Sequence, residues 1–544
     1  MTNFERLKEG GKKYLLIPVM PTPNGGLHLG HLAGPFLKMD VLARAQRRMG
    51  NEVATFFGSD GYESYMNLKS WQTGKGVTEL CNEFHERMRS DLDALSIEYD
   101  AFINPLDPIY NADFKSFITN VVKDLVAKGV VEIRPEKYLY SKDEDCYLAG
   151  CWILGDCPVC GSGSGSYQCE DCGTQYRPMD LKSPAFRRGD FPLTSVEDKD
   201  LYLVINKKEE LFQHLEAMQA GPEFIEIAKT YFNHQGNYIR LSNPGKWGIP
   251  WEIEDSKIPH VLFTYSALYF YSLFCGELYK KKFNTALNPL DKNSEVVTVA
   301  SFGIDCTIPY MVASVALGLE GDQYRPIDYL SPNHFYTLEN AKFSTSRGHA
   351  IWGDDIVNKT PVNADAVRYF LVLFNPENAM SDFSVEAFLK FVNDDLANEL
   401  QPLLEKAWGS LDEQLLSEPD ETFIKKLEDI LIAQQESLTP PGFQLKASSD
   451  PLKDWIGYGK QHSFENNSAY WWLKGFALLA FPIMPGCAMS IWNLLGQEGN
   501  PLVSAFFLQS QPNRNSKLPA YFKSINFDEL KPALPATLFT NELK

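Results

Sequence analysis

The fold of this chain is decided by the stretch Met20-Pro21-Thr22-Pro23-Asn24-Gly25-Gly26-Leu27-His28-Leu29-Gly30-His31. The apolar run from Tyr14 to Ile17 before it predicts a buried strand, and the residues from Leu32 to Arg48 after it have helical spacing. A strand, a turn rich in glycine and proline, and a helix in this order bring backbone N–H groups and a helix N-terminus against a phosphate. The stretch therefore predicts an α/β fold with a phosphate-binding turn.

Two histidines mark the start of this helix. His28 and His31 are three residues apart, so they project the same way and both imidazoles can reach one ligand. Gly25, Gly26 and Gly30 allow that ligand to approach the backbone closely. The alternative is an incidental histidine pair beside a turn, and the flanking strand and helix favour the ligand site.

Length and composition indicate a large globular protein. With 544 residues, of which 44% are apolar and 13% aromatic, the chain can bury the cores of several domains. Its net charge of −19 argues against a protein that binds nucleic acid through overall positive charge, although a local basic patch remains compatible with it.

The apolar regions indicate a cytoplasmic protein without a membrane partner. Residues Met1 to Lys13 are charged and lack the apolar centre of a signal peptide. The most apolar region, Trp471 to Leu495, is interrupted by Lys474 and two prolines, so it predicts a pair of buried helices and not a membrane span. Ten cysteines without a secretory signal point to a reducing compartment, where metal binding is the first role to consider.

Strand patterns recur on both sides of a long interruption. Glu52 to Phe57 predicts a second strand that ends at Gly58-Ser59-Asp60, and Glu295 to Phe302 predicts another that ends at Gly303-Ile304-Asp305. Polar tips just beyond the carboxyl ends of strands are where open α/β sheets bind ligands. The pattern predicts a doubly wound parallel sheet, split by an insertion and followed from about Ala364 by a helical bundle.

The insertion carries a cysteine motif of metal-binding type. Cys157-Pro158-Val159-Cys160 and Cys169-Glu170-Asp171-Cys172 form two CxxC turns separated by eight residues. Each turn directs two thiolates to one point, so the pair predicts a structural zinc site with no position left for water. Four free or disulfide-paired thiols are the alternative.

A second phosphate-facing motif follows the predicted strand His334 to Leu338. The loop Lys342-Phe343-Ser344-Thr345-Ser346-Arg347-Gly348 combines cations, hydroxyls and a flexible glycine. Such a loop suits a mobile clamp that neutralises the charge developing on departing pyrophosphate. Taken alone, it could equally be a solvated surface turn.

Together these motifs resemble the class I aminoacyl-tRNA synthetases, and most closely their methionyl branch. His28-Leu29-Gly30-His31 is similar to the HIGH signature, and the Lys342 loop is similar to the KMSKS loop. The zinc knuckle, Trp247-Gly248-Ile249-Pro250 and the segment Asn393 to Asn398 also follow in the family's order.

The resemblance implies a five-part organisation and a set of site residues. Residues 1–117 and 256–330 would be the two halves of a Rossmann-type catalytic domain, and residues 118–255 would be the insertion with its zinc knuckle. Residues 331–385 would contain the Lys342 loop and the stem-contact region, and residues 386–544 would form a helical domain like those that bind anticodons. The implied catalytic residues are His28, His31, Lys342, Ser344, Ser346 and Arg347. The implied ATP-binding residues are Asn24, Gly25, Gly30, Gly303 and Asp305. The implied amino-acid-binding residues are Met20, Thr22, Asp60, Thr264, Tyr271 and Tyr310. ATP would be a substrate with Mg²⁺, an amino acid would be activated, and tRNA would be the acceptor in this family.

The chain departs from the family's pattern at recognition positions. Thr22 replaces a pocket tyrosine, Thr264 a tryptophan and Tyr310 a histidine, while Thr345 replaces the second lysine of the loop. In the helical domain Gln401-Pro402 replaces a Gly-Asn pair, and no clear proline–tryptophan pair is present to stack an anticodon base; Trp455 looks more like a core residue.

Three functions therefore remain open from the sequence. The first is a divergent methionyl-type enzyme that charges tRNA. The second is a paralogue that activates another amino acid for a non-tRNA acceptor, as an amide- or ester-forming ligase. The third is a catalytically silent binding protein, which the intact His28, His31, Asp60, Asp305 and Lys342 disfavour.

Overall fold

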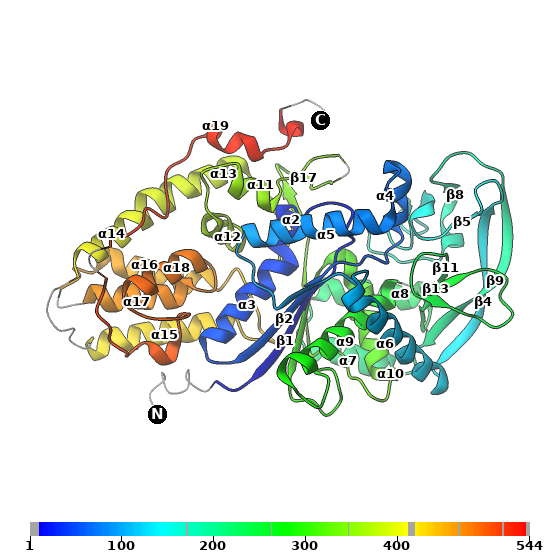
Figure 1. Ribbon diagram of the computed structural model, residues 1–544, viewed down its shortest axis with the longest axis horizontal. Helices are drawn as coiled ribbons and strands as arrows, with labels where there is room; N and C mark the ends of the chain where they lie inside the picture. Colours follow the sequence, from blue (N-terminus) through cyan, green and yellow to red (C-terminus); the bar gives the residue numbers. More distant parts are fainter. Residues whose placement is uncertain are drawn as a thin grey trace.

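The computed structural model describes residues 10–169, 172–262, 264–345, 347–411, 419–465, 468–513 and 516–539, without the side chains of 264–267. Ser346 lies outside the described residues, as does the side chain of Thr264. Figure 1 shows a central sheet with the cysteine-bearing insertion on one side and the helical bundle on the other.

The central sheet is parallel throughout and confirms the predicted α/β class. Its strands are β1 (Lys13–Pro18), β2 (Glu52–Gly58), β3 (Ala101–Ile103), β14 (Val297–Gly303) and β15 (Tyr329–Asn333). They lie in the order β15-β14-β1-β2-β3, and every neighbouring pair is parallel. The chain leaves β1 toward β2 on one side and returns through β14 on the other. The strand order therefore reverses between β1 and β14, where such sheets bind ligands.

The helices between β1 and the insertion cover this sheet. They are α2 (Leu29–His31), η1 (Leu32–Phe36), α3 (Leu37–Arg48), α4 (Tyr65–Thr73), α5 (Val77–Ala94) and α6 (Pro108–Ala127). Helix α3 is buried on nearly all sides, and α5 buries Met88 and Leu92 at the predicted helical spacing. The segment from Leu32 to Arg48 is helical as predicted but kinks at Gly34, whose ψ of −112° precedes Pro35. A side chain at Gly34 would meet that of Asn333, so the kink lets the helix approach β15 closely.

The insertion is built mainly from antiparallel strands. Its larger sheet has the order β10-β9-β4-β5, from β4 (Val131–Ser141), β5 (Cys146–Tyr147), β9 (Leu193–Val204) and β10 (Tyr238–Arg240). The smaller elements are η2 (Gly150–Trp152), β6 (Ile153–Asp156), β7 (Gly163–Gly165), η3 (Pro178–Asp180), β8 (Lys182–Phe186), β11 (Ser242–Pro244), β12 (Pro250–Trp251) and β13 (His260–Leu262). Two helices, α7 (Lys208–Ala217) and α8 (Pro222–Gln235), connect β9 to β10.

Two predicted domain limits fall inside structural units. The limit between 117 and 118 lies within α6, because Phe114, Ile118 and Val122 continue one buried helical face across it. The limit between 255 and 256 precedes β13, which pairs with β11 and β12 of the insertion. Hydrophobic spacing marks neither boundary, because α6 continues across the first one and the sheet of β11, β12 and β13 continues across the second.

The chain around the returning strands β14 and β15 contains α9 (Thr264–Phe283), η4 (Ile304–Cys306), η5 (Ile308–Ser314) and α10 (Val315–Glu320). A small sheet, β17-β16-β18, follows from Tyr336–Leu338 (β16), Ala341–Lys342 (β17) and Ser381–Phe383 (β18). Between β17 and β18 lie α11 (Gly353–Asn358) and α12 (Ala364–Leu373).

The bundle comprises α13 (Val385–Lys390), η6 (Phe391–Leu400), α14 (Gln401–Gly409), α15 (Glu421–Ser437), α16 (Ser449–Gln461), α17 (Ser468–Ala480) and α18 (Pro485–Leu494). Trp455 is fully buried, and its indole N–H donates to the Trp472 carbonyl while that of Trp472 donates back to the Trp455 carbonyl. The predicted buried helix pair is confirmed as α17 and α18. Among the described residues no helix is both long and apolar enough to cross a bilayer.

The C-terminal segment returns from the bundle toward α11 and β17 (Figure 1). It contains η7 (Val503–Ala505), α19 (Phe527–Leu530), η8 (Lys531–Ala533) and η9 (Ala536–Leu538). Asn393 exchanges two hydrogen bonds with the backbone of Ile525, both 2.8 Å long. Gln401 bonds to the backbones of Pro519 and Phe522. These two bundle residues therefore hold the C-terminal segment in place.

A buried ion cluster joins α3 beside the central sheet, α12 and the bundle. Asp40 of α3 is fully buried and lies 2.9 Å from Arg44 Nε and 2.6 Å from Arg368 Nη2. Arg368, on α12, also donates to the carbonyls of Leu95 and Ile483. Burial raises the pKa of Asp40, but the charges of the two arginines outweigh it and hold the pKa below its usual value. One carboxylate thus fixes the relative positions of three parts of the chain.

The substitution Arg368→Ala should lower stability by about 3–5 kcal/mol, because it removes one partner from a fully buried ion cluster. Thermal unfolding followed by circular dichroism measures the effect as a melting temperature several degrees lower. Lys425→Ala is the control, since its pair with Asp429 is exposed and should contribute less than about 1 kcal/mol. Equal melting temperatures for the two variants would contradict the importance of the cluster.

Candidate active site

The stretch Met20 to His31, called the histidine turn below, lies at the switch point of the sheet. It runs beside residues 349–353, which follow the Lys342 loop. His28 caps the helix, and its Nδ1 accepts a hydrogen bond from the His31 amide at 3.3 Å. Leu29 N donates to Ile351 O at 2.9 Å, and Gly353 N donates to Leu27 O at 3.2 Å. The two sequence motifs are therefore held together by backbone hydrogen bonds.

The two imidazoles are stacked and uncharged. Their ring centres are 3.7 Å apart, and the Phe343 ring stacks on the other face of His28 at 4.7 Å. Burial lowers the pKa of His28 well below its usual value, with the neighbouring His31 adding to the effect, and burial lowers the pKa of His31 to about 4. His31 Nδ1 is buried without a hydrogen-bond partner among the described residues. Neutral imidazoles in this position can hydrogen-bond a phosphate oxygen that enters the site.

The Lys342 loop reaches the same turn. Residues Ser344 and His349 exchange backbone hydrogen bonds of 3.0 Å and close the loop into a hairpin. A side chain at Gly25 would come within 2.6 Å of Thr345 Cγ2, so the glycine lets the loop pack on the histidine turn. Lys342 and Arg347 are exposed, and Lys342 Nζ lies 4.7 Å from the centre of the Phe335 ring. The cations of the loop thus face solvent at the edge of the switch point.

Asp91 is a site-shaping residue that the sequence reasoning missed. Its carboxylate accepts from Leu27 N at 2.8 Å and from Asp354 N at 2.9 Å, and it pairs with Arg87 at 3.3 Å. Burial raises its pKa to about 6. It therefore connects the start of the histidine turn to the segment after the Lys342 loop. In the sequence it is only one acidic residue on a helix, with no motif to single it out.

Gly303 and Asp305 stand on the other side of the switch point, at the end of β14. A side chain at Gly303 would lie 2.5 Å from Asp305 Oδ1 and would displace the Asp305 carboxylate. The Asp305 side chain is exposed, and its carbonyl accepts a hydrogen bond from Gln168 Nε2 of the insertion. Asn24 is half-buried on the facing turn. The predicted ATP residues thus lie on the turn after β1 and at the end of β14, on the two sides of the switch point, where parallel sheets form their binding crevice.

Asp60 lies beside this crevice, just beyond β2. It is 3% exposed, and its amide donates to Pro21 O at 2.9 Å, which joins it to the histidine stretch. Burial raises the pKa of its carboxyl group well above the usual value, and the Glu63 charge adds to this rise. No ion pair with a cationic side chain forms at Asp60 within the part of the chain that the structure describes. A buried carboxylate without a cation is suited to receive one from a ligand.

The other residues predicted to bind the amino acid differ in how deeply they are buried near Asp60. Met20, Tyr271 and Tyr310 are buried in one hydrophobic cluster. Tyr271 OH donates to Ser59 O at 2.9 Å, and Tyr310 stacks on Phe302 at 4.4 Å. Thr22 is half-buried. The Asp60 charge raises the pKa of both tyrosines, after the larger effect of burial, which reflects how near they lie.

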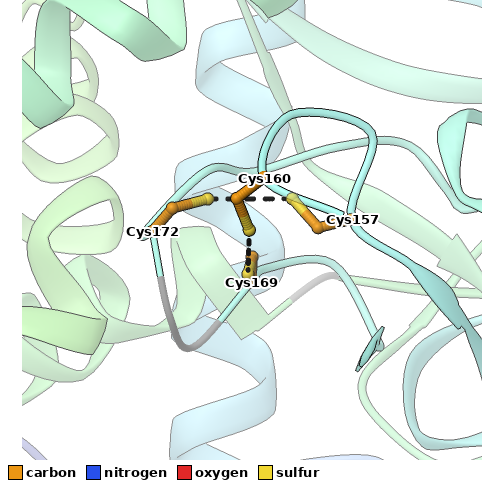
Figure 2. A group of neighbouring side chains, drawn as sticks. All are labelled: Cys157, Cys160, Cys169 and Cys172. Carbon is orange, nitrogen blue, oxygen red and sulfur yellow. Dashed lines mark hydrogen bonds between the residues drawn. The ribbon is translucent and has the colours of Figure 1, made fainter. Parts of the chain in front are cut away.

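The four motif cysteines come together in the insertion. Their sulfur atoms all lie within 4.8 Å of one another, with Cys157 and Cys172 3.7 Å apart and Cys160 and Cys169 3.6 Å apart (Figure 2). Four sulfurs at about 2.3 Å from one ion in a tetrahedron are separated by about 3.8 Å. The arrangement therefore fits a tetrahedral divalent cation held by four thiolates.

Comparisons with known proteins agree with this geometry. Residues 15–408 match the family model described as tRNA synthetases class I (M). The chain is 28% identical to the methionine–tRNA ligase of Protochlamydia amoebophila, over 89% of this chain and 73% of that protein. It is 26% identical to that of Chlamydia abortus, over 90% and 93% of the two chains.

The fold also matches a solved structure, the Mycobacterium tuberculosis methionyl-tRNA synthetase in complex with methionyl-adenylate. The TM-score is 0.69 at 18% identity, and the match covers 94% of this chain and 98% of the other. With the paired motifs at the switch point and a family match over most of its length, the chain belongs to the class I tRNA synthetases of the methionyl (M) type.

Proposed function

We propose that this protein activates methionine with ATP and transfers the methionyl group to tRNA. The observation that carries the proposal is the meeting, at one switch point, of the His28–His31 pair, the Lys342 loop and the buried Asp60. Relatives named methionine–tRNA ligase that align over about nine-tenths of the chain support it.

Asp60 is proposed to hold the amino acid. Its buried carboxylate would pair with the α-ammonium group, and the Coulomb attraction in this dry site would return the raised pKa of Asp60 toward its usual value. The ammonium would supply the cation that the site lacks. The amino acid's carboxylate would then point toward the crevice between β1 and β14, where ATP is proposed to bind.

The first reaction needs positioning and charge stabilisation. A carboxylate oxygen of the amino acid attacks the α-phosphorus, and the bond from that phosphorus to the bridging oxygen breaks, so pyrophosphate leaves with the electron pair. His28 and His31 would donate hydrogen bonds to phosphate oxygens in the transition state, while Lys342, Ser344, Ser346 and Arg347 would close over the pyrophosphate. Mg²⁺, when bound to the phosphates, would neutralise part of their charge.

The second reaction is proposed to use tRNA as the acceptor. A ribose hydroxyl at its 3′ end attacks the acyl carbon of the adenylate and releases AMP. Asn393, in the segment that resembles the family's helical domain, and Gln401, where the chain departs from it, both bind the C-terminal segment of this chain. Other surfaces of the bundle would therefore meet the tRNA.

ATP–pyrophosphate exchange with each of the twenty amino acids, followed by tRNA charging, tests the function. We expect exchange to be greatest with methionine and methionyl-tRNA to form. Exchange with a different amino acid only, and no charged tRNA, would replace the proposal by a ligase for another amino acid, which the changes at Thr22, Thr264 and Tyr310 would then explain.

Replacing His28 by alanine should lower the exchange rate by about 10²–10³-fold, because one preorganised donor to the transition state is lost. His462→Ala, in the chain after α16, is the control and should leave exchange unchanged. Steady-state exchange kinetics measure both variants. Wild-type exchange in His28→Ala would remove His28 from the proposed catalytic residues.

The four-cysteine cluster is proposed to hold a structural zinc ion. Cys157→Ser should lower the bound zinc below one equivalent per chain and lower the melting temperature, because the segment around it has only a small apolar core. Cys146→Ser, outside the cluster, should retain the metal. Elemental analysis and thermal unfolding measure the two effects; full zinc content in Cys157→Ser would refute the assignment.

A further inference from the structure

A cavity of about 430 Å³ opens in the insertion, away from the switch point. Its walls come from β4, β9, β10 and the end of α8 on one side, and from Tyr167 and residues 175–177 of the cysteine-bearing segment on the other. None of the residues assigned above to ATP, the amino acid or the metal lines it. Volumes of this size are typical of small-molecule sites.

One wall carries a positive charge that the protein does not neutralise. Arg240 is paired with Glu136 and Asp200, and Arg177 is paired with Asp180. Arg134 has no ion pair or hydrogen bond among the described residues, and its Nη1 atom is buried without a partner. The charge of Arg134 is therefore available to an anion that enters the cavity.

A second buried donor lacks a partner in the same cavity. Gln175 is 5% exposed, and its Nε2 atom makes no hydrogen bond within the described part of the chain. Its backbone carbonyl accepts from Gln235 Nε2 at 3.2 Å, which ties the two walls together. An unsatisfied buried donor costs about 1–3 kcal/mol, and an acceptor on a ligand would remove that cost. Both unsatisfied atoms are donors, so the ligand must offer acceptors.

The remaining lining is rich in flat rings. Five tyrosines line the cavity, and these are Tyr167, Tyr176, Tyr202, Tyr231 and Tyr238. The Arg134 guanidinium lies over the Tyr238 ring, 3.5 Å from its centre. Arginine planes and tyrosine rings are the surfaces on which planar bases stack.

We propose that this cavity binds a nucleotide. Its phosphate or base acceptors would take hydrogen bonds from Arg134 Nη1 and Gln175 Nε2, and its base would stack on the Arg134–Tyr238 pair. A free nucleotide and an unpaired nucleotide of an RNA strand offer this same chemistry. Tyr167 lines the cavity, and the next residue, Gln168, bonds to Asp305 beside the switch point, so the site is close to the catalytic crevice. The assignment is independent of the amino acid that the enzyme activates.

Isothermal titration of the full-length protein with cytidine monophosphate and with a four-nucleotide RNA tests the proposal, and dependence on Arg134 separates the cavity from the ATP site. The wild type should bind at least one of the two probes. Arg134→Ala should weaken that binding about tenfold or more, because it removes a charged donor and a stacking plane. Tyr238→Leu should weaken it as well, and Arg134→Lys, which keeps the charge but loses the planar group, should fall between Arg134→Ala and the wild type.

Lys137→Ala is the matched control. Lys137 lies on the same strand as Arg134, is exposed and pairs with Glu197, and it does not line the cavity. This substitution removes the same charge from the strand, so it should leave binding unchanged. Melting temperatures within a few degrees of the wild type confirm that each variant is folded.

The outcomes separate the two sources of nucleotide. Arg134-dependent binding of cytidine monophosphate supports a free nucleotide, and Arg134-dependent binding of the RNA alone supports an unpaired RNA nucleotide. The proposal is overturned if neither probe binds, or if Arg134→Ala and Tyr238→Leu bind as tightly as the wild type. Methionine-dependent exchange is measured on the same samples; its absence in the wild type would refute the proposed function without affecting this result.

Discussion

The Asp40 carboxylate holds the architecture of this protein together. It has no contact with solvent and is paired with Arg44 on its own helix and with Arg368 on α12. A buried carboxylate is costly unless cations and hydrogen bonds surround it, and here both arginines and the Glu98 amide do so. Because Asp40 lies on the helix that follows the histidine turn, the same cluster orients that turn against the bundle.

Other contacts of α3 act in the same way. Arg48 donates to Gln434 Oε1 and to the Leu478 carbonyl of the bundle, and Lys38 donates to the carbonyls of Ser331 and Pro332 in β15. These charged side chains are almost completely buried. A helix that is buried on nearly all sides and anchored by charges has little freedom to tilt. Such rigidity suits chemistry that depends on positioning and not on a protein nucleophile.

The proposed active site combines satisfied and unsatisfied groups. Asp91 satisfies the backbone around the histidine turn. Among the described residues, His31 Nδ1 has no hydrogen-bond partner, and the Asp60 carboxylate accepts from the Tyr62 amide but has no cationic partner. The neutral state of the histidines follows from burial. The scaffold is therefore complete on its own, and the unsatisfied polar groups lie where a ligand is proposed to bind.

Much of this protein was predictable from local pattern. The parallel sheet, the helix pair around Trp471 to Leu495 and the convergence of the four cysteines follow from periodicity and spacing, which are short-range properties. The domain boundary predicted between residues 117 and 118 lies inside α6. Its buried helical face continues across that position, so the hydrophobic pattern gives no signal there. Asp91 could not be identified either, since its importance lies in hydrogen bonds to residues 64 and 263 positions away.

The sequence by itself determined the class of fold, the order of the motifs and the chemistry that each motif can perform, because strand and helix periods and ligand spacing are encoded within a few residues. Only the tertiary structure decided that Gln401 and Trp455 face the protein's own C-terminal segment and core. It also decided that, among the described residues, the Arg134 side chain lies on a tyrosine ring without an ion pair and Asp60 is buried without a cation. These properties depend on which distant segments exclude water from a side chain, and burial of that kind is a property of the packed molecule.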